Sequence, residues 1–245
     1  MKQLLTFIES NTPPIRTILT LGPVFFVWAY CSLSLAGYLK SRMRLKTGYT
    51  RKTFHVLIFL TAATIQQTLG LPLVCLFGAM TTLILAYALL RGAGHPLYEA
   101  IAREKNEPYR TYYIIIPYLA TLAGGIAGNL WFGPASLIGY LVGGLGDAAG
   151  EPVGTRWGRR RYTVPTLSSV KTTRTIEGSI GVFIASLVAV AVGILLAPGF
   201  TINPHSVALI PLIALGCALL EAVSPHGWDN ATMQIGPAFL AALLL

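Results

Sequence analysis

The stretch that decides the fold is GSIGVFIASLVAVAVGILLAPGFTINPHSVALIPLIALGCALL, residues 178–220, which contains no Asp, Glu, Lys or Arg. A helix needs about 20 apolar residues to cross the hydrocarbon core of a bilayer. This run is long enough for two crossings, and Pro198-Gly199 and Pro204 interrupt it near its centre. It therefore predicts two membrane-spanning helices joined by a short uncharged turn.

The same pattern recurs along the chain. Four more runs lack charged residues, and they cover 17–39, 53–90, 111–146 and 230–245. The two longest are broken at Gly70-Leu71-Pro72 and at Gly133-Pro134. With 54% hydrophobic residues and a mean hydropathy of +0.64, the composition excludes a soluble domain. We predict an all-α polytopic membrane protein with about eight transmembrane helices in a single membrane domain, residues 1–245.

The charged residues predict the orientation. All basic residues except Lys2 and Arg16, and all acidic residues except Glu9, lie in or beside four connections that would share one face. These connections are 40–52, 91–112, 151–177 and 222–230, and 1–16 forms an N-terminal segment. The positive-inside rule makes their face cytoplasmic, so we expect a protein of the cell (inner) membrane with both termini on the other side. Within the second connection, residues 94–110 predict an amphipathic helix at the interface or a simple connector.

The net charge of +9 has other interpretations than topology. Anionic lipid headgroups would also attract the basic connections. No soluble module is present that could use the charge to bind nucleic acid, so we expect no nucleic-acid partner.

Two carboxylates lie at the edge of an apolar segment in GGLGDAAGEPVGTRWGRRRYTVP, residues 143–165. Asp147 and Glu151 are four positions apart and would share one face of a helix. Near a membrane boundary they would repel each other and lose hydration. Mg²⁺ would resolve both costs, because it prefers carboxylate oxygens together with substrate phosphates. The alternative is a helix end with charged anchors.

Basic residues follow these carboxylates directly. They are Arg156, Arg159, Arg160, Arg161 and Lys171. Arginine binds phosphate oxygens in bidentate fashion, so the stretch predicts a phosphate site beside a metal site. As an alternative, these residues serve only as a topology signal.

Further polar patches lie on the same predicted face. Arg51, Lys52 and His55 open the second predicted span, although a lone histidine there is often a structural hydrogen bonder. Arg174, Glu177, Gly178 and Ser179 open the sixth span, whose helix N-terminus would suit an anion. Glu221, Ser224, Asp229 and Asn230 join the last two spans and add oxygen ligands, although a plain loop has a similar composition.

Together these patches resemble the CTP-dependent polyprenol kinases (phytol kinase, dolichol kinase and CTP-using diacylglycerol kinase), relatives of the phosphatidate cytidylyltransferases. The matching features follow the family's order over about residues 51–237. They are Arg51-Lys52-x-x-His55; Gly146-Asp147 with Gly154 and Gly158; Lys171 and Arg174 before Glu177-Gly178-Ser179; and Glu221-x-x-Ser224-Pro225-x-Gly227-x-Asp229-Asn230. Glu151 and the Thr-rich segment 170–179 depart from the family's pattern.

The resemblance implies a Mg²⁺-dependent kinase that uses CTP to phosphorylate a membrane lipid alcohol. Asp147 would hold the metal, helped by Glu151 or by Asp229 and Asn230, and Lys171 would be catalytic. His55 or a carboxylate would take the alcohol proton. The residues expected around the nucleotide are Arg51, Lys52, Gly146, Arg156, Arg159, Arg174, Gly178 and Ser179. Glu177, Glu221 and Ser224 are further candidates.

Two other functions remain open. A cytidylyltransferase would use the same site, with a lipid phosphate attacking the α-phosphorus of CTP. A transporter or membrane scaffold would need the charges for topology and ion binding. A transporter is expected to carry ionisable groups near the bilayer midplane and to show an internal repeat, and neither is seen in this sequence.

Overall fold

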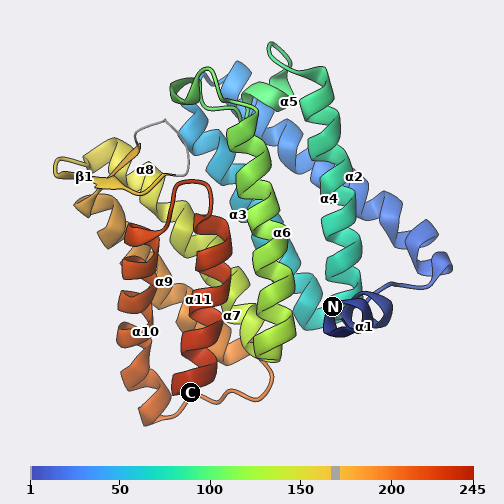
Figure 1. Ribbon diagram of the computed structural model, residues 1–245, viewed down its shortest axis with the longest axis vertical. Helices are drawn as coiled ribbons and strands as arrows, with labels where there is room; N and C mark the ends of the chain where they lie inside the picture. Colours follow the sequence, from blue (N-terminus) through green and yellow to red (C-terminus); the bar gives the residue numbers. More distant parts are fainter. Residues whose placement is uncertain (1, 167–171) are drawn as a thin grey trace. The chain divides into compact units, whose positions relative to one another are not determined.

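The computed structural model describes residues 2–166 and 172–245, and its contacts divide the chain into two compact units, Met1–Ala102 and Arg103–Leu245 (Figure 1). The prediction of a single membrane domain over residues 1–245 stays a prediction.

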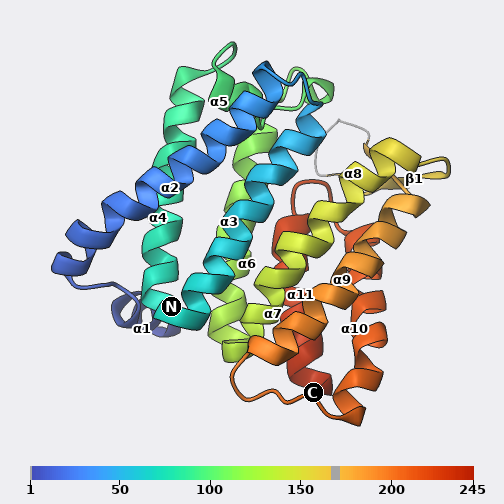
Figure 2. The same cartoon turned by 180° about the vertical axis from the view of Figure 1, so that it is seen from behind.

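The first unit consists of helices. They are α1 (Lys2–Ser10), α2 (Ile15–Ser41), α3 (Thr47–Leu69), α4 (Leu71–Arg91) and α5 (Pro96–Glu99). Helix α2 packs against α3, α4 and α5 (Figure 2). Phe25 of α2 meets Phe77 of α4 edge to face, with ring centroids 5.7 Å apart. Gly70 joins α3 to α4 at a φ of +88°, a backbone conformation that glycine adopts without steric cost.

The second unit combines long helices with one hairpin. Its elements are η1 (Glu104–Asn106), α6 (Tyr112–Phe132), η2 (Gly133–Ala135), α7 (Ser136–Leu141), η3 (Val142–Gly146), α8 (Asp147–Trp157), β1 (Arg161–Val164), β2 (Thr172–Thr175), α9 (Ile176–Leu196), α10 (Pro204–Val223) and α11 (Asp229–Leu244). Helix α11 packs against α6, α7 and α10, while α9 packs against α7, α8 and α10. Ile138, Val182 and Met233 are fully buried in this packing.

Five helical segments among the described residues are long and apolar enough to cross a membrane. They are Ile15–Ser41, Leu71–Arg91, Tyr112–Trp157, Ile176–Leu196 and Pro204–Val223. The predicted breaks are confirmed at Gly70, at Gly133, where the long third segment bends at a φ of +50°, and between α9 and α10. Helices α3 and α11 are not among these five segments: α3 carries Arg51 and Lys52 near its start, and α11 has 16 residues. The count of about eight crossings stays a prediction.

Two connections are shorter than the sequence predicts. Helix α3 begins at Thr47, and α8 continues through Glu151 to Trp157. The reason is that charged residues such as Arg and Glu favour helix nearly as well as apolar ones, so a change in charge does not end a helix.

The predicted amphipathic helix over residues 94–110 is wrong as a continuous element. In the described part of the chain, this segment forms α5 and the short turn η1. Arg103 between them has extended backbone, with φ of −67° and ψ of 129°, which interrupts the helix.

The hairpin β1–β2 is a departure from the all-α prediction. The strands pair antiparallel, with Tyr162 opposite Arg174 and Val164 opposite Thr172. β-Branched residues are frequent in both strands and favour extended backbone. The hairpin delivers Arg174 to the start of α9, beside the loop between α10 and α11.

Candidate active site

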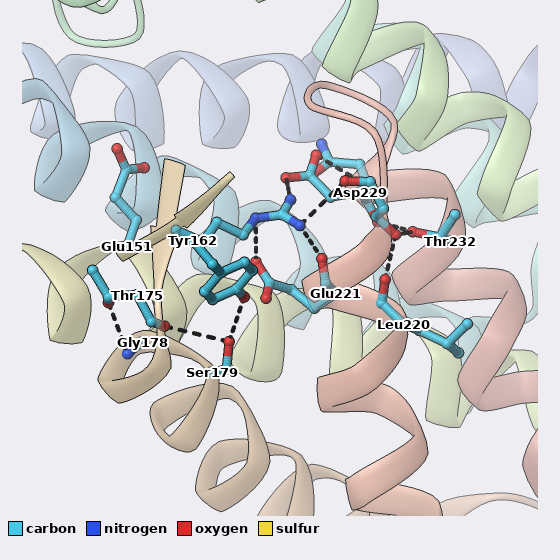
Figure 3. A network of polar contacts seen from close by, with 12 residues as sticks. Glu151, Tyr162, Thr175, Gly178, Ser179, Leu220, Glu221, Asp229 and Thr232 are labelled. Atoms are coloured by element: carbon cyan, nitrogen blue, oxygen red, sulfur yellow. Dashed lines mark hydrogen bonds and ion pairs between the residues drawn. The ribbon is translucent and has the colours of Figure 1, made fainter. Parts of the chain in front are cut away.

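Arg174 lies in β2, and its guanidinium is buried among acceptors from the end of α10 and the start of α11. Its Nε lies 2.8 Å from Oε1 of Glu221, and its Nη2 lies 3.1 Å from Oδ2 of Asp229. Its Nη1 donates to the carbonyl oxygens of Glu221 and Ser224. Figure 3 shows Glu221 and Asp229 converging on this network. All three guanidinium nitrogens are therefore engaged.

The electrostatics of this cluster favour a fixed charge. Burial alone would lower the pKa of the Arg174 guanidinium, but the carboxylates of Asp229, Glu221 and Asp147 outweigh it and raise that pKa above its ordinary value. The side chains of Arg174 and Glu221 are 12% and 8% exposed, so water screens their attraction weakly. Removing one member of such a pair leaves the other charge buried and uncompensated.

The two carboxylates singled out from the sequence both lie on α8 but have different surroundings. Asp147 is the first residue of α8 and is 3% exposed, and its charge acts on Arg174. Glu151, one turn later, forms a partly buried ion pair with Arg103. The structure thus groups Asp147 electrostatically with Glu221 and Asp229, and pairs Glu151 with Arg103.

A glycine-rich π-helical turn, η3, precedes Asp147. Such turns inside α-helices are frequent at functional sites. A Cβ atom on Gly146 would lie 2.5 Å from Oγ of Ser186 in α9 and 3.2 Å from Cγ1 of Val142, so a larger residue would force these side chains to shift. Gly146 therefore positions Asp147 by packing.

The loop between α10 and α11 is anchored at both ends. The Ser224 hydroxyl donates to the carbonyl of Leu220 at 2.6 Å and also contacts the hydroxyl of Thr232. The side-chain nitrogen Nδ2 of Asn230 donates to Thr121 Oγ1 at 2.8 Å and to the carbonyl oxygen of Pro117. A metal ion could therefore use only the side-chain oxygen of Asn230.

His226 is a loop residue that the sequence analysis did not select. It is 8% exposed, its backbone N–H donates to Pro165, and its ring lies against Tyr113 at 4.7 Å between centroids. These contacts fix the loop on its two neighbouring segments.

The hairpin is joined to the first turn of α9. Tyr162 and Ser179 share a hydrogen bond of 2.7 Å between their hydroxyl oxygens (Figure 3). Burial is the main reason why the pKa of the Tyr162 hydroxyl is raised. Tyr162 therefore keeps its proton and can donate a hydrogen bond. Thr175 caps α9 by accepting from the N–H of Gly178 at 3.0 Å.

Gly178 and Glu177 have structural contacts in the same turn. A Cβ atom on Gly178 would meet the carbonyl oxygen of Gly150 at 2.8 Å, which shows how closely α8 and α9 approach. The Glu177 carboxylate accepts from the backbone N–H groups of Arg159, at 3.0 Å, and of Arg160. Glu177 thereby holds the turn that leads into β1.

The remaining basic candidates are placed differently. Arg156, Arg159, Arg160 and Arg161 are exposed, and Arg156 lies over the ring of Trp157. Lys171 lies outside the described residues. Arg51, Lys52 and His55 belong to the first unit, in the first three turns of α3. Lys52 is 5% exposed, and His55 stacks on Phe59.

The carboxylates of the site are chemically suited to Mg²⁺, which prefers oxygen ligands. Among the described residues, no group of three or more His, Cys, Asp and Glu side chains is close enough to form a metal cluster. Mg²⁺ usually takes one or two protein carboxylates and completes its shell with water and substrate phosphates. Glu221 and Asp229 already direct one oxygen each at the cationic guanidinium of Arg174. Their chemistry and placement fit such a cation.

Besides His226, sequence reasoning missed three residues of the site. Arg103 was assigned to a loop, while Tyr162 and Thr232 were not considered. The partners of Arg103 and Tyr162 are 48 and 17 positions away, so no local spacing pattern marks them. The Thr232 hydroxyl is eight positions from Ser224, and the chain folds back between them.

Comparisons with known proteins give one informative match. The phytol kinase of Synechocystis sp. is 32% identical over 146 residues, which cover 60% of this chain and 58% of the relative. The matched region thus spans little more than half of that protein. No protein-family model matches the chain, and no solved structure matches it. The similarity supports a phytol- or polyprenol-kinase-like family.

Proposed function

We propose that this protein phosphorylates a membrane lipid alcohol, with CTP as the phosphoryl donor and Mg²⁺ as the required cation. The observation that carries the proposal is the similarity to the phytol kinase of Synechocystis sp.. The apolar helices suit a substrate that is dissolved in the bilayer. The accepted alcohol would belong to the phytol, polyprenol or diacylglycerol class.

The carboxylates have the first role in this proposal. One or two of the carboxylates of Asp147, Glu221 and Asp229 would bind Mg²⁺ directly, and the side-chain oxygen of Asn230 is a further proposed ligand. A bound Mg²⁺ would supply positive charge that neutralises the nucleotide phosphates. Glu151 would contribute indirectly, by holding Arg103 in an ion pair.

Cationic and hydrogen-bonding groups would orient the phosphates. Phosphoryl transfer depends mainly on positioning and on electrostatic stabilisation. Arg174 supplies a guanidinium at the carboxylates, and Tyr162 supplies a protonated hydroxyl at the start of α9. Lys171, Arg51, Lys52 and the arginines 156 and 159 remain proposed phosphate-binding residues.

The reaction forms one bond and breaks one. The lipid hydroxyl oxygen would attack the γ-phosphorus of CTP, and the bond from that phosphorus to the β–γ bridging oxygen would break. CDP would leave, and the hydroxyl proton would pass to His55 or to a carboxylate. We expect the site to face the cytoplasm, where the basic connections are predicted to lie.

The test follows the labelled phosphate. The purified full chain is incubated with Mg²⁺ and a panel of phytol, polyprenol and diacylglycerol, using CTP labelled at either the γ- or the α-phosphate. Label from the γ-position in the lipid product, with release of CDP, supports the proposal. Label from the α-position in the product of an added lipid phosphate, with pyrophosphate released from CTP, would make the protein a cytidylyltransferase. Chelation of Mg²⁺ should abolish the transfer.

A further inference from the structure

The guanidinium of Arg174 occupies the place at which the carboxylates of the site converge. It lies 2.8 Å from an oxygen of Glu221 and 3.1 Å from an oxygen of Asp229, and the charge of Asp147 also acts on it. A divalent cation on Glu221 and Asp229 would need the same oxygens.

We propose that Arg174 is an internal counter-ion that excludes a free divalent cation from Glu221 and Asp229 until nucleotide phosphates arrive to receive the guanidinium. This inference rests on the proposed function, because it takes these carboxylates as the ones that bind Mg²⁺. Arg174 is thus assigned to control of the cation site, in addition to any contact with phosphate.

Competition follows from geometry and charge. The guanidinium takes the Glu221 oxygen through Nε and the Asp229 oxygen through Nη2, and the side chains of the three residues are 8–14% exposed. A cation bound beside an unmoved Arg174 would meet a positive charge a few ångströms away, in surroundings that screen it weakly. Cation binding therefore requires Arg174 to leave both carboxylates.

Release of Arg174 requires another anion. A guanidinium that left two carboxylates without a new partner would lose its strongest hydrogen bonds while still partly buried. Nucleotide phosphate oxygens accept the same paired N–H groups as a carboxylate does. The nucleotide would therefore make cation binding easier, and by linkage the cation would make nucleotide binding easier.

The direct experiment measures binding of Mn²⁺ alone to the purified full chain, with free Mn²⁺ followed by electron paramagnetic resonance. We expect Arg174→Gln to bind Mn²⁺ at least about tenfold more tightly than the wild type, because a nearby positive charge has been removed. The matched control is Arg110→Gln, since Arg110 is equally buried at 12% exposure but pairs with the exposed Glu107 at 3.5 Å. Its Mn²⁺ affinity should stay within about twofold of the wild type. Equal or weaker binding by Arg174→Gln would overturn the proposal.

A second arm adds saturating CTP and measures Mn²⁺ bound to protein. The difference between wild type and Arg174→Gln should then fall below about threefold, because the phosphates hold the guanidinium of the wild type. A difference that CTP leaves unchanged contradicts the release step.

The third arm guards against an unfolded variant. In a Glu221→Gln background, one of the negative charges that Arg174 neutralises is already absent. Replacing Arg174 in this background therefore leaves less repulsion between carboxylates and destabilises the fold less. There we expect Glu221→Gln with Arg174→Gln to bind Mn²⁺ at least about fivefold more tightly than Glu221→Gln alone. No difference would overturn the proposal. These arms measure cation affinity, so they succeed or fail independently of whether the wild type yields a labelled lipid.

Discussion

Two arginine-containing regions of the second unit differ sharply in what they contact. The stretch from Arg156 to Arg161 is rich in arginine, and its side chains are exposed. Arg174 stands alone in β2, and its side chain is 12% exposed, with Glu221 and Asp229 bound to it. The stretch with the most arginines in the sequence is therefore the one whose side chains are most exposed in the structure.

Burial and ion pairing distinguish Arg174 from the exposed arginines, whereas the number of nearby charges does not. Exposed basic clusters on one face are also what membrane topology demands, so their density carries little information about chemistry. Removing a guanidinium from water costs free energy, which carboxylates must offset through well-aligned ion pairs and hydrogen bonds. Burial and partners, which sequence density does not reveal, therefore separate Arg174 from the cluster.

The largest expected effect tests the buried side of this comparison. Arg174→Gln should destabilise the protein by roughly 3 kcal/mol, because it leaves Glu221 and Asp229 without their shared cation. Thermal unfolding in detergent, without divalent cations, should show a melting temperature lower by about 6 °C or more. An unchanged melting temperature would show that the ion pairs of Arg174 contribute no more to stability than the exposed arginines do.

The next effect concerns activity. Asp147→Asn should retain the fold and lose lipid phosphorylation by about 100-fold, the scale expected when one group that stabilises charge in the reaction is removed. Glu107→Gln makes the same chemical change at a carboxylate that is 63% exposed, and it should leave both activity and melting temperature unchanged. Normal turnover by a folded Asp147→Asn protein would remove Asp147 from the proposed metal site.

Much of the helical framework could be predicted, because its breaks have local causes. Gly70 and Gly133 adopt positive φ angles, and the segment from Pro198 to Pro204 contains two prolines and a glycine. The hairpin could not be predicted in the same way. Its strands are four residues long, and their pairing joins Tyr162 to Arg174 across twelve positions. Such pairing depends on tertiary contacts more than on propensity.

Several residues of the candidate site could be predicted from the sequence, but the ion pairs between them could not. Sequence motifs selected Arg174, Glu221 and Asp229, and the structure brings all three together. Their spacing of about 50 positions could not show that the arginine binds those carboxylates. Glu151 was expected to help Asp147 hold a metal, and that role stays a prediction. The structure pairs its carboxylate with Arg103, a partner that no motif identifies.

A smaller effect is expected at the edge of the buried cluster. Tyr162→Phe removes a hydroxyl that lies 2.7 Å from the Ser179 oxygen, and it should cost about 1 kcal/mol of stability. Activity should fall by less than about tenfold, because the group orients its neighbours and carries no charge. A double-mutant cycle with Ser179→Ala checks this: additive losses would show that the two hydroxyls do not act together.

The smallest effect is expected in the exposed stretch, at Arg160. This residue contributes to the turn before β1 through its backbone: its N–H donates to the Glu177 carboxylate at 3.3 Å, and its carbonyl accepts from Ile176 at 3.0 Å. Arg160→Gln keeps both backbone contacts and removes an exposed charge. It should therefore change stability by no more than about 0.5 kcal/mol.

Lipid phosphorylation by Arg160→Gln should stay within about twofold of the wild type, because water and salt screen an exposed charge. Glu177→Gln is the informative partner, since it weakens the acceptor of those backbone bonds and should lower the melting temperature while Arg160→Gln does not. A large loss of activity in Arg160→Gln, with an unchanged melting temperature, would show that the exposed arginines also bind the nucleotide, and the contrast with Arg174 would then be one of burial alone.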